Sequence, residues 1–149
     1  MSPAAGDGIV FTQIWRQSPI HAIRLTPGGA APEPVWVSAK PGPQEPSLLY
    51  YRGILYALLD TGILTALEGA TGRELYRERV AAEANSSPVA ADGRIYVSDI
   101  RGRTTVLQAG PEPRVLAANE LGERITASPA LVSGKLLLRT DSRLWCVQA

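Results

Sequence analysis

The stretch Ser87-Pro88-Val89-Ala90-Ala91-Asp92-Gly93-Arg94-Ile95-Tyr96-Val97 is the clearest copy of a repeat that runs through the chain. Each copy has a short apolar run, a tight turn that ends in glycine, and a second run rich in branched and aromatic residues. The turn glycines Gly53, Gly93 and Gly134 stand 40 and 41 residues apart, and Gly8 stands 45 residues before Gly53. A Ser-Pro pair recurs at residues 2–3, 87–88 and 128–129. A fixed period of this length indicates a repeat architecture.

Each repeat predicts four short strands. The first strand enters at the Ser-Pro pair, and the following turn, for example Asp92-Gly93, suits the positive φ angles of a two-residue hairpin. We expect the second strand at residues 9–11, 54–56, 94–97 and 135–138, and the third at residues 20–23, 64–67, 104–107 and 144–147. A fourth, more polar strand follows in three repeats, around residues 35–37, 74–76 and 114–116. No segment keeps a helical period over ten residues, so little or no helix is expected.

The middle strands carry apolar residues on both faces, and this pattern requires a neighbouring sheet on each side. Radial stacking of twisted four-stranded blades supplies those neighbours. The prediction is therefore an all-β fold, a partial β-propeller of about 3.75 blades: three full repeats and a fourth that lacks its outer strand. The chain forms one segment, residues 1–149, with repeats at approximately 2–45, 46–85, 86–126 and 127–149. A sandwich of about seven strands is the alternative, although it would not need a matched turn in every repeat.

The repeat resembles the PQQ-like β-propeller repeat in the Ser-Pro entry, the Asp-Gly turn and the run Ala70-Thr71-Gly72-Arg73-Glu74-Leu75-Tyr76. In that family an aromatic residue after this turn docks between blades. Trp36 and Tyr76 match it, and Leu116 departs from it. The resemblance covers nearly the whole chain and is strongest to propellers of the outer-membrane-assembly lipoprotein type and their bacterial relatives. It implies a ring of seven or eight blades, of which this chain resembles the C-terminal half or a natural half that pairs with another copy.

Composition narrows the possible functions. The 149 residues carry 15 basic and 14 acidic side chains in a dispersed pattern, which gives no basic patch for nucleic acid. The apolar runs are far too short to span a membrane. The first residues lack the pattern of a secretory signal, so the chain is either cytoplasmic or a mature piece of an exported protein. The resemblance implies a periplasmic or cell-envelope location, and the compartment stays open.

Few side chains suggest chemistry. The single cysteine, Cys146, shares its repeat column with Ala22, Ala66 and Val106, so we expect a buried structural thiol. His21 is the only histidine, which leaves a histidine metal site incomplete, and we expect it to be a polar residue on the third strand. Four aspartates fall at or beside turns, where their carboxylates are expected to bond to local backbone donors: Asp60, Asp92, Asp99 and Asp141.

One segment is a candidate for contact with a partner. Trp15 and Arg16 lie in an irregular excursion between the second and third strands of the first repeat. An aromatic residue beside an arginine on a loop suits a protein contact, although local packing is the preferred explanation of the pair. Trp36 and Trp145 occupy strand positions, and packing between blades explains them.

No cofactor is expected. The resemblance implies that true quinoprotein dehydrogenases hold PQQ with calcium, an adjacent-cysteine disulfide, a stacked tryptophan and a catalytic acid, whereas this chain has one cysteine. The preferred hypothesis is a non-enzymatic scaffold that binds a protein partner or a second copy of itself. Two alternatives stay open: a fragment of a quinoprotein-like oxidoreductase, and a propeller that binds a carbohydrate or small ligand through Tyr50, Tyr51 or Trp15.

Overall fold

The computed structural model describes residues 1–26, 28 and 30–148. Pro27 and Gly29 of the first repeat and Ala149 of the fourth lie outside the described residues. Within the described part the regular structure consists of fifteen β-strands arranged in four antiparallel sheets. The all-β prediction is therefore confirmed.

Each sheet is one blade, and its strands are ordered as they occur in the chain. Blade 1 contains β1 (Ala4–Gly6), β2 (Ile9–Gln13), β3 (Pro19–Arg24) and β4 (Glu33–Pro41). Blade 2 contains β5 (Leu49–Tyr51), β6 (Ile54–Leu58), β7 (Ile63–Glu68) and β8 (Glu74–Arg79). Blade 3 contains β9 (Val89–Ala91), β10 (Arg94–Ser98), β11 (Arg103–Gln108) and β12 (Arg114–Glu120). Blade 4 contains β13 (Ala130–Val132), β14 (Lys135–Arg139) and β15 (Leu144–Gln148).

The predicted hairpin turns are confirmed by the backbone. In the turn between β9 and β10, Asp92 and Gly93 have φ angles of 48° and 76°. The same pair of positive values recurs in the first turn of the other three blades. Because both central residues need positive φ, an Asp-Gly or Ser-Gly pair is favoured there and Arg52 is the unusual occupant.

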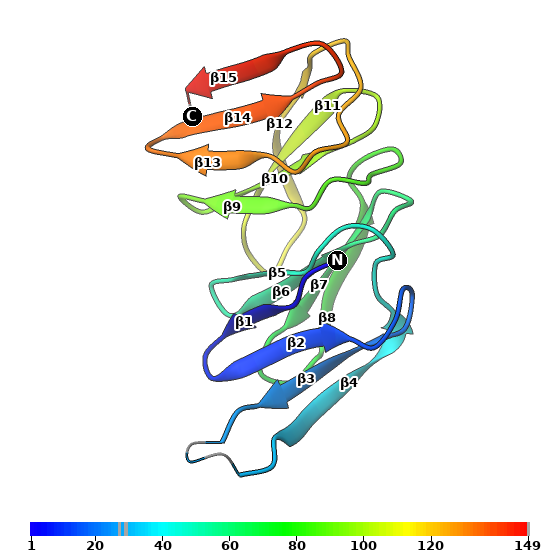
Figure 1. Ribbon diagram of the computed structural model, residues 1–149, viewed down its shortest axis with the longest axis vertical. Coiled ribbons are helices and arrows are strands. Elements are labelled where there is room, and N and C mark those ends of the chain that lie inside the picture. Colours follow the sequence, from blue (N-terminus) through cyan, green and yellow to red (C-terminus); the bar gives the residue numbers. More distant parts are fainter. Residues whose placement is uncertain (27, 29, 149) are drawn as a thin grey trace.

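The four blades are stacked in chain order along the long axis of the molecule (Figure 1). Their first strands lie next to one another, because β1 contacts β5, β5 contacts β9, and β9 contacts β13. Among the described residues no comparable approach joins the outer strands β4, β8 and β12. The sheets therefore diverge from a shared inner edge, as propeller blades do, and the predicted partial propeller is confirmed.

Each joint between neighbouring blades encloses its own apolar core. The face of a blade that is turned toward the next blade in the chain is called here the forward face, and the opposite face is called the backward face. At each joint the forward face of one blade packs against the backward face of the next blade. At the middle joint, Tyr56, Leu58 and Leu64 of blade 2 pack with Ile95 and Leu107 of blade 3. Separate cores fill the joint between blades 1 and 2 and the joint between blades 3 and 4. The apolar residues on both faces of the middle strands are explained by these paired interfaces.

The aromatic position of the outer strand is partly as predicted. Trp36 and Tyr76 lie opposite Ala22 and Ala66, and the Trp36 indole N–H donates to the carbonyl of Gly69 in the next blade at 2.9 Å. The corresponding residue in blade 3 is not Leu116, as the sequence suggested. The pairing of β11 and β12 is irregular here and places Ala117 opposite Val106. Blades 1 and 2 have the same irregularity, so the shift has another cause: the connection between the paired residues of the third and fourth strands is one residue longer in blade 3 than in blade 2.

Candidate partner-binding surfaces

A row of serines runs along the inner edge of the blades. The backbone N–H of Ser2 donates to the Ser47 hydroxyl oxygen at 2.8 Å. The N–H of Ser47 donates to Ser87 Oγ at 2.9 Å, and the N–H of Ser87 donates to Ser128 Oγ at 2.9 Å. At each joint the earlier blade thus supplies the amide donor and the later blade supplies the hydroxyl acceptor, so all the hydrogen bonds of the row point toward the C-terminal blade. The recurring Ser-Pro pair was visible in the sequence, but its bonding partner is the next blade and was missed.

A buried carboxylate secures the joint between blades 2 and 3. Asp99 is 2% exposed and accepts from the N–H of Ala82, in the linker between the blades, at 3.1 Å. The same carboxylate accepts from the N–H groups of Arg101 and Arg103 in its own turn at 2.9 and 3.1 Å. Three amide donors satisfy a charge that would be costly to bury alone. The predicted bonding to local backbone is correct for this aspartate.

An aspartate also secures the joint between blades 1 and 2, but its carboxylate accepts from two linker amides rather than from its own turn. Asp60 accepts from the N–H groups of Gln44 and Glu45 at 2.9 and 2.8 Å. Both donors lie in the linker that precedes blade 2, so the expected bonding of Asp60 to its own turn is wrong. Asp141 instead forms an ion pair with Arg124 at 3.6 Å. Asp60 and Asp99 therefore each join a blade to the linker that precedes it.

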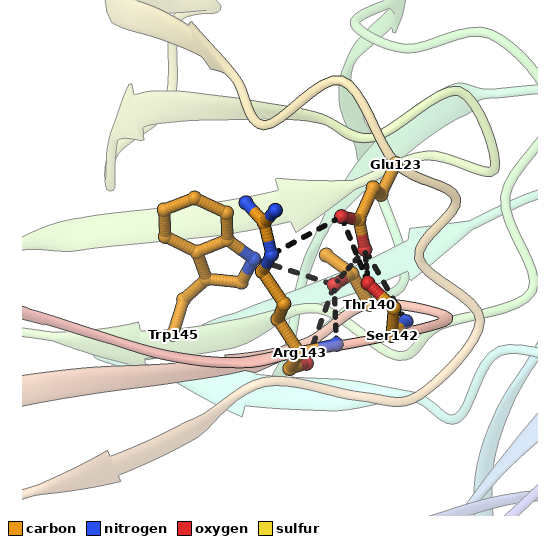
Figure 2. Close-up of polar contacts among 5 residues, drawn as sticks. All are labelled: Glu123, Thr140, Ser142, Arg143 and Trp145. Carbon is orange, nitrogen blue, oxygen red and sulfur yellow. Dashed lines mark hydrogen bonds and ion pairs between the residues drawn. The ribbon is translucent and has the colours of Figure 1, made fainter.

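At the joint between blades 3 and 4 the carboxylate comes from the linker (Figure 2). Glu123 accepts from the hydroxyl of Thr140 at 2.7 Å and from the hydroxyl and N–H of Ser142. The guanidinium of Arg143 lies 3.6 Å from the same carboxylate, and the Trp145 indole N–H donates to Thr140 Oγ1 at 3.3 Å. The hydroxyl donors of Thr140 and Ser142 lower the pKa of Glu123. Sequence reasoning missed Glu123, because it lies in a linker outside the repeated positions.

The tyrosines considered for ligand binding are used in the joints. The Tyr50 hydroxyl donates to the Asp7 carboxylate at 2.6 Å across the joint between blades 1 and 2. Burial, together with this carboxylate, raises the pKa of Tyr50 to about 12. The Tyr51 hydroxyl accepts from the N–H of Gly93 at 3.0 Å in the next blade. Because both side chains connect blades, neither forms a free aromatic platform.

Two tyrosines on the forward face of blade 2 differ in their polar contacts. The hydroxyl of Tyr56 accepts from the N–H of Gly110 at 3.0 Å. The hydroxyl of Tyr76 is buried without a hydrogen-bond partner in the described part of the chain. Burial raises the pKa of both phenols. The joint between blades 2 and 3 therefore contains one satisfied and one unsatisfied hydroxyl.

The forward face of blade 4 is open. Leu144 and Val132 are 71% and 53% exposed, and Cys146 is also exposed. The prediction of a buried thiol at Cys146 is wrong, although its position in the repeat is right. Its counterparts Ala22 and Ala66 are covered by the next blade, whereas no described blade covers Cys146.

The outer edge of blade 4 is also open. In the other blades the third strand pairs with an outer strand, whereas β15 pairs with β14 alone among the described residues. Beside this edge lies a groove of about 430 Å³, whose apolar lining includes Leu116, Ala117, Leu136 and Val147. Leu116 is 45% exposed and Val147 is 42% exposed. An unpaired strand edge beside an apolar groove is a template for another strand.

The predicted contact segment lies on the opposite blade. Trp15 is 74% exposed, and its neighbour Ile14 is 80% exposed, so local packing does not cover the indole. The loop is closed by Ser18, whose hydroxyl donates to the Trp15 carbonyl at 2.6 Å. Arg16 forms an ion pair with Glu45 at 2.8 Å. The structure therefore holds Trp15 at the surface, while Arg16 faces the linker to blade 2.

The residues present do not fit a quinone cofactor site. Among the described residues no group of three or more His, Cys, Asp or Glu is arranged to hold a metal ion. The chain has a single cysteine, so the adjacent-cysteine feature cannot form. His21 pairs with Thr12 and Val37 on the backward face of blade 1. No helix in the described part is long and apolar enough to span a membrane.

These features define a class: an all-β propeller segment with packed joints between its blades and an exposed face at each end of the described part. A family model described as outer membrane protein assembly factor BamB matches residues 12–110. The chain therefore belongs to this family of PQQ-like propellers. A search of curated proteins found no match.

Solved structures show the same fold. BamB from Moraxella catarrhalis is similar with a TM-score of 0.75 and 14% identity over 93% of this chain and 39% of that protein. A europium-containing methanol dehydrogenase gives a TM-score of 0.64 and 15% identity over 78% of this chain and 23% of that enzyme. The computationally designed Ika4 protein gives 0.78 and 13% identity over 97% of this chain and 89% of the design. The chain thus spans well under half the length of the two natural proteins.

Proposed function

We propose that this chain is a non-enzymatic protein-interaction module that binds an extended segment of a partner protein along the outer edge of β15. A second copy of the chain is a further partner, at a different surface. The observation that carries the proposal is the unpaired edge of β15 beside an apolar groove. The carboxylates of Asp60 and Asp99 and the hydroxyls of Tyr50 and Tyr51 are engaged at the joints between blades, which favours a scaffold over an enzyme.

The internal blades indicate what the edge would accept. In blade 2 the outer strand β8 pairs antiparallel with β7 and directs Tyr76 into the joint. A partner segment at β15 would hydrogen-bond through its backbone and place alternate apolar side chains over Leu116 and Val147. Strand addition obtains affinity from the backbone and specificity from alternate side chains. The partner is therefore an extended segment with apolar side chains near its centre, as β8 has at Leu75 and Tyr76. The family to which this chain belongs is described as an outer membrane protein assembly factor, and this description is consistent with a role in binding proteins.

A peptide supplied by the chain itself tests the proposal. The probe is a fluorescein-labelled peptide with the sequence of residues 73–80, which includes β8. Fluorescence anisotropy should show saturable binding with Kd in the range of about 10–100 μM, because a short strand must be ordered on binding. The same peptide with alternate backbone amides N-methylated should not bind, since it cannot extend the ladder.

Two matched variants locate the binding surface. Leu116→Lys places a charge in the groove and should weaken binding at least tenfold. Leu25→Lys changes a leucine that is 61% exposed on blade 1 and should leave binding unchanged. Equal binding to both variants, or equal binding of the N-methylated peptide, would show that the edge of β15 is not the site.

The similarity to a methanol dehydrogenase supports a second candidate, a fragment of a quinoprotein-like oxidoreductase whose catalytic residues lie elsewhere. Adding PQQ and Ca²⁺ distinguishes the two. A bound cofactor would raise the melting temperature, since ligands of the folded state stabilise it, and would change the quinone absorption. The scaffold proposal expects neither change.

The surface around Trp15 and Arg16 supports an additional contact on blade 1. Trp15→Ala should leave the unfolding free energy within about 0.5 kcal/mol of the unchanged protein, because the indole is exposed. Trp15→Ala should also leave the binding of the residue 73–80 peptide unchanged, which would separate the surface around Trp15 from the edge of β15. A melting temperature lowered by several degrees would instead show that Trp15 is a packing residue.

A further inference from the structure

The three joints inside the chain repeat one hydrogen bond between serines. The last blade carries a serine that could act as the donor of a further bond of this kind, and the first blade carries a serine that could act as its acceptor. At every joint the serine N–H of one blade donates to the serine hydroxyl of the next. At the ends, Ser128 has no acceptor for its N–H, and no donor reaches the Ser2 hydroxyl, among the described residues. The free donor and the free acceptor are complementary. A forward end would therefore meet a backward end, and two like ends would not match.

The exposed faces are complementary in the same direction. On the forward face of blade 4, Leu137 and Cys146 take the positions that Tyr56 and Ala66 hold in the buried joint after blade 2. Leu144 takes the position of the buried Leu64 on that face.

The backward face of blade 1 shows the other half of the joint. There, Val10 and Ile23 take the positions that Leu55 and Leu67 hold in the buried core between blades 1 and 2. Val37 lies beside His21 on this face and is 52% exposed. Apolar faces of this kind are rarely left open on a soluble protein.

We propose that these ends bind a second copy of the same chain, head to tail, with the forward face of blade 4 on the backward face of blade 1. The inference rests on the proposed role as a protein-interaction module, although it uses the end faces and not the edge of β15. Two copies then form two identical joints, each continuing the serine row from Ser128 of one copy to Ser2 of the other. A contact of this heterologous type either closes into a ring or grows into a filament. Two four-blade halves match a closed ring of about eight blades.

The first test is the mass in solution. Light scattering during gel filtration of the full chain at about 50–100 μM should give twice the 15.9 kDa of one chain. A monomer at this concentration would overturn the proposal. A series of larger masses would also overturn it, because open growth would mean that the joints do not close a pair.

Two surface variants then test the head-to-tail direction. Val37→Arg disables only the backward end, and Leu144→Arg disables only the forward end. Each variant alone should be monomeric. An equimolar mixture should recover a dimer, because the intact forward end of Val37→Arg meets the intact backward end of Leu144→Arg. If like ends joined instead, one variant would stay dimeric alone and the mixture would gain nothing. Val115→Arg is the control, because Val115 is 55% exposed on the outer strand of blade 3, away from both ends, and this variant should remain dimeric.

Cys146 supplies a reporter that needs no mutation in its surroundings. Its thiol is exposed in the single chain and would be covered in the pair. Reaction with a thiol reagent should be at least tenfold slower in the unchanged dimer than in Val37→Arg, whose own forward face is intact. Equal rates, with circular dichroism showing folded protein in both, would contradict the proposed joint. Because Val37→Arg should still bind the residue 73–80 peptide, failure of pairing and failure of strand binding give different results.

Discussion

The middle joint and the last joint are built to the same plan but differ in how much they bury. Ten buried apolar residues form the core between blades 2 and 3, whereas four form the core between blades 3 and 4. The carboxylate of the middle joint is Asp99, almost fully buried, while the last joint uses Glu123, whose side chain is 24% exposed. The outer strand of blade 2 and the linker after it account for part of the difference, because they add Tyr76, Val80 and Ala84 to the middle core, whereas in the described part of the chain β12 adds no residue to the last core. In a repeat protein, where stability is a sum of units and nearest-neighbour interfaces, blade 4 is expected to open first.

The largest expected effect comes from matched truncations in the two cores. Ile95 and Leu136 hold the same strand position, in blades 3 and 4 respectively, and are 0% and 5% exposed. Ile95→Ala should lower the unfolding free energy by about 4 kcal/mol, and Leu136→Ala by about 2 kcal/mol, since the thinner core relaxes more easily around the lost atoms. Urea denaturation at one fixed protein concentration measures both. Equal costs would show that the two joints are packed equally well.

The carboxylates should show a smaller contrast. Asp99→Ala leaves three backbone N–H groups without their acceptor and should lower the unfolding free energy by about 2–3 kcal/mol. Ser142 is exposed to water, and the buried Thr140 hydroxyl keeps the Arg143 carbonyl as an acceptor at 3.2 Å, so Glu123→Ala should lower it clearly less than Asp99→Ala does. Thermal unfolding of both variants beside the unchanged protein is the measurement. A larger loss for Glu123→Ala would mean that the last joint depends on its polar contacts more than on its core.

The two tyrosines sharpen the comparison within the middle joint itself. Tyr56→Phe removes the acceptor of the Gly110 N–H and should lower the unfolding free energy by about 1 kcal/mol. Tyr76→Phe removes a buried hydroxyl that has no partner, so it should be neutral or stabilising by up to about 1 kcal/mol. Equilibrium denaturation of this pair provides its own control, because the same atom is deleted at two positions of one interface. Destabilisation by Tyr76→Phe equal to that of Tyr56→Phe would show that the Tyr76 hydroxyl has a partner after all.

Much of this architecture could be predicted from the sequence, since it depends on local chemistry. The turns at Asp92-Gly93 and its counterparts need positive φ, and the middle strands need cover on both faces. The remaining features depend on relations that cross blades. The exposure of Cys146 depends on whether another blade covers it, and the shift at Leu116 depends on a connection that is one residue longer in blade 3 than in blade 2. The bonding partners of the row of serines and of Glu123 lie in neighbouring blades, so they can be identified only in the three-dimensional structure.

The last prediction concerns acid, and its effect is the smallest. The hydroxyls of Thr140 and Ser142 donate to the Glu123 carboxylate and hold its pKa below the ordinary value in the folded protein. A lowered folded-state pKa stabilises the fold above the unfolded-state pKa, and this stabilisation is lost as the pH falls through the folded-state pKa. Blade 4 should therefore loosen as the pH falls below the ordinary pKa of a glutamate, and the NMR signal of the Trp145 indole N–H can follow this because the group donates to Thr140.

Glu123→Gln should remove the part of the acid transition that belongs to blade 4. Glu68 provides the matched control: Thr71 and Arg73 lower its pKa in the same way, but it lies in blade 2. Glu68→Gln should leave the Trp145 transition where it is in the unchanged protein. If the transition moved equally in both variants, acid would be acting on the whole propeller. A transition that moves only with Glu123→Gln would assign the acid sensitivity to the joint between blades 3 and 4. That joint has the smallest apolar core, so the polar contacts of Glu123 contribute a larger part of its stability.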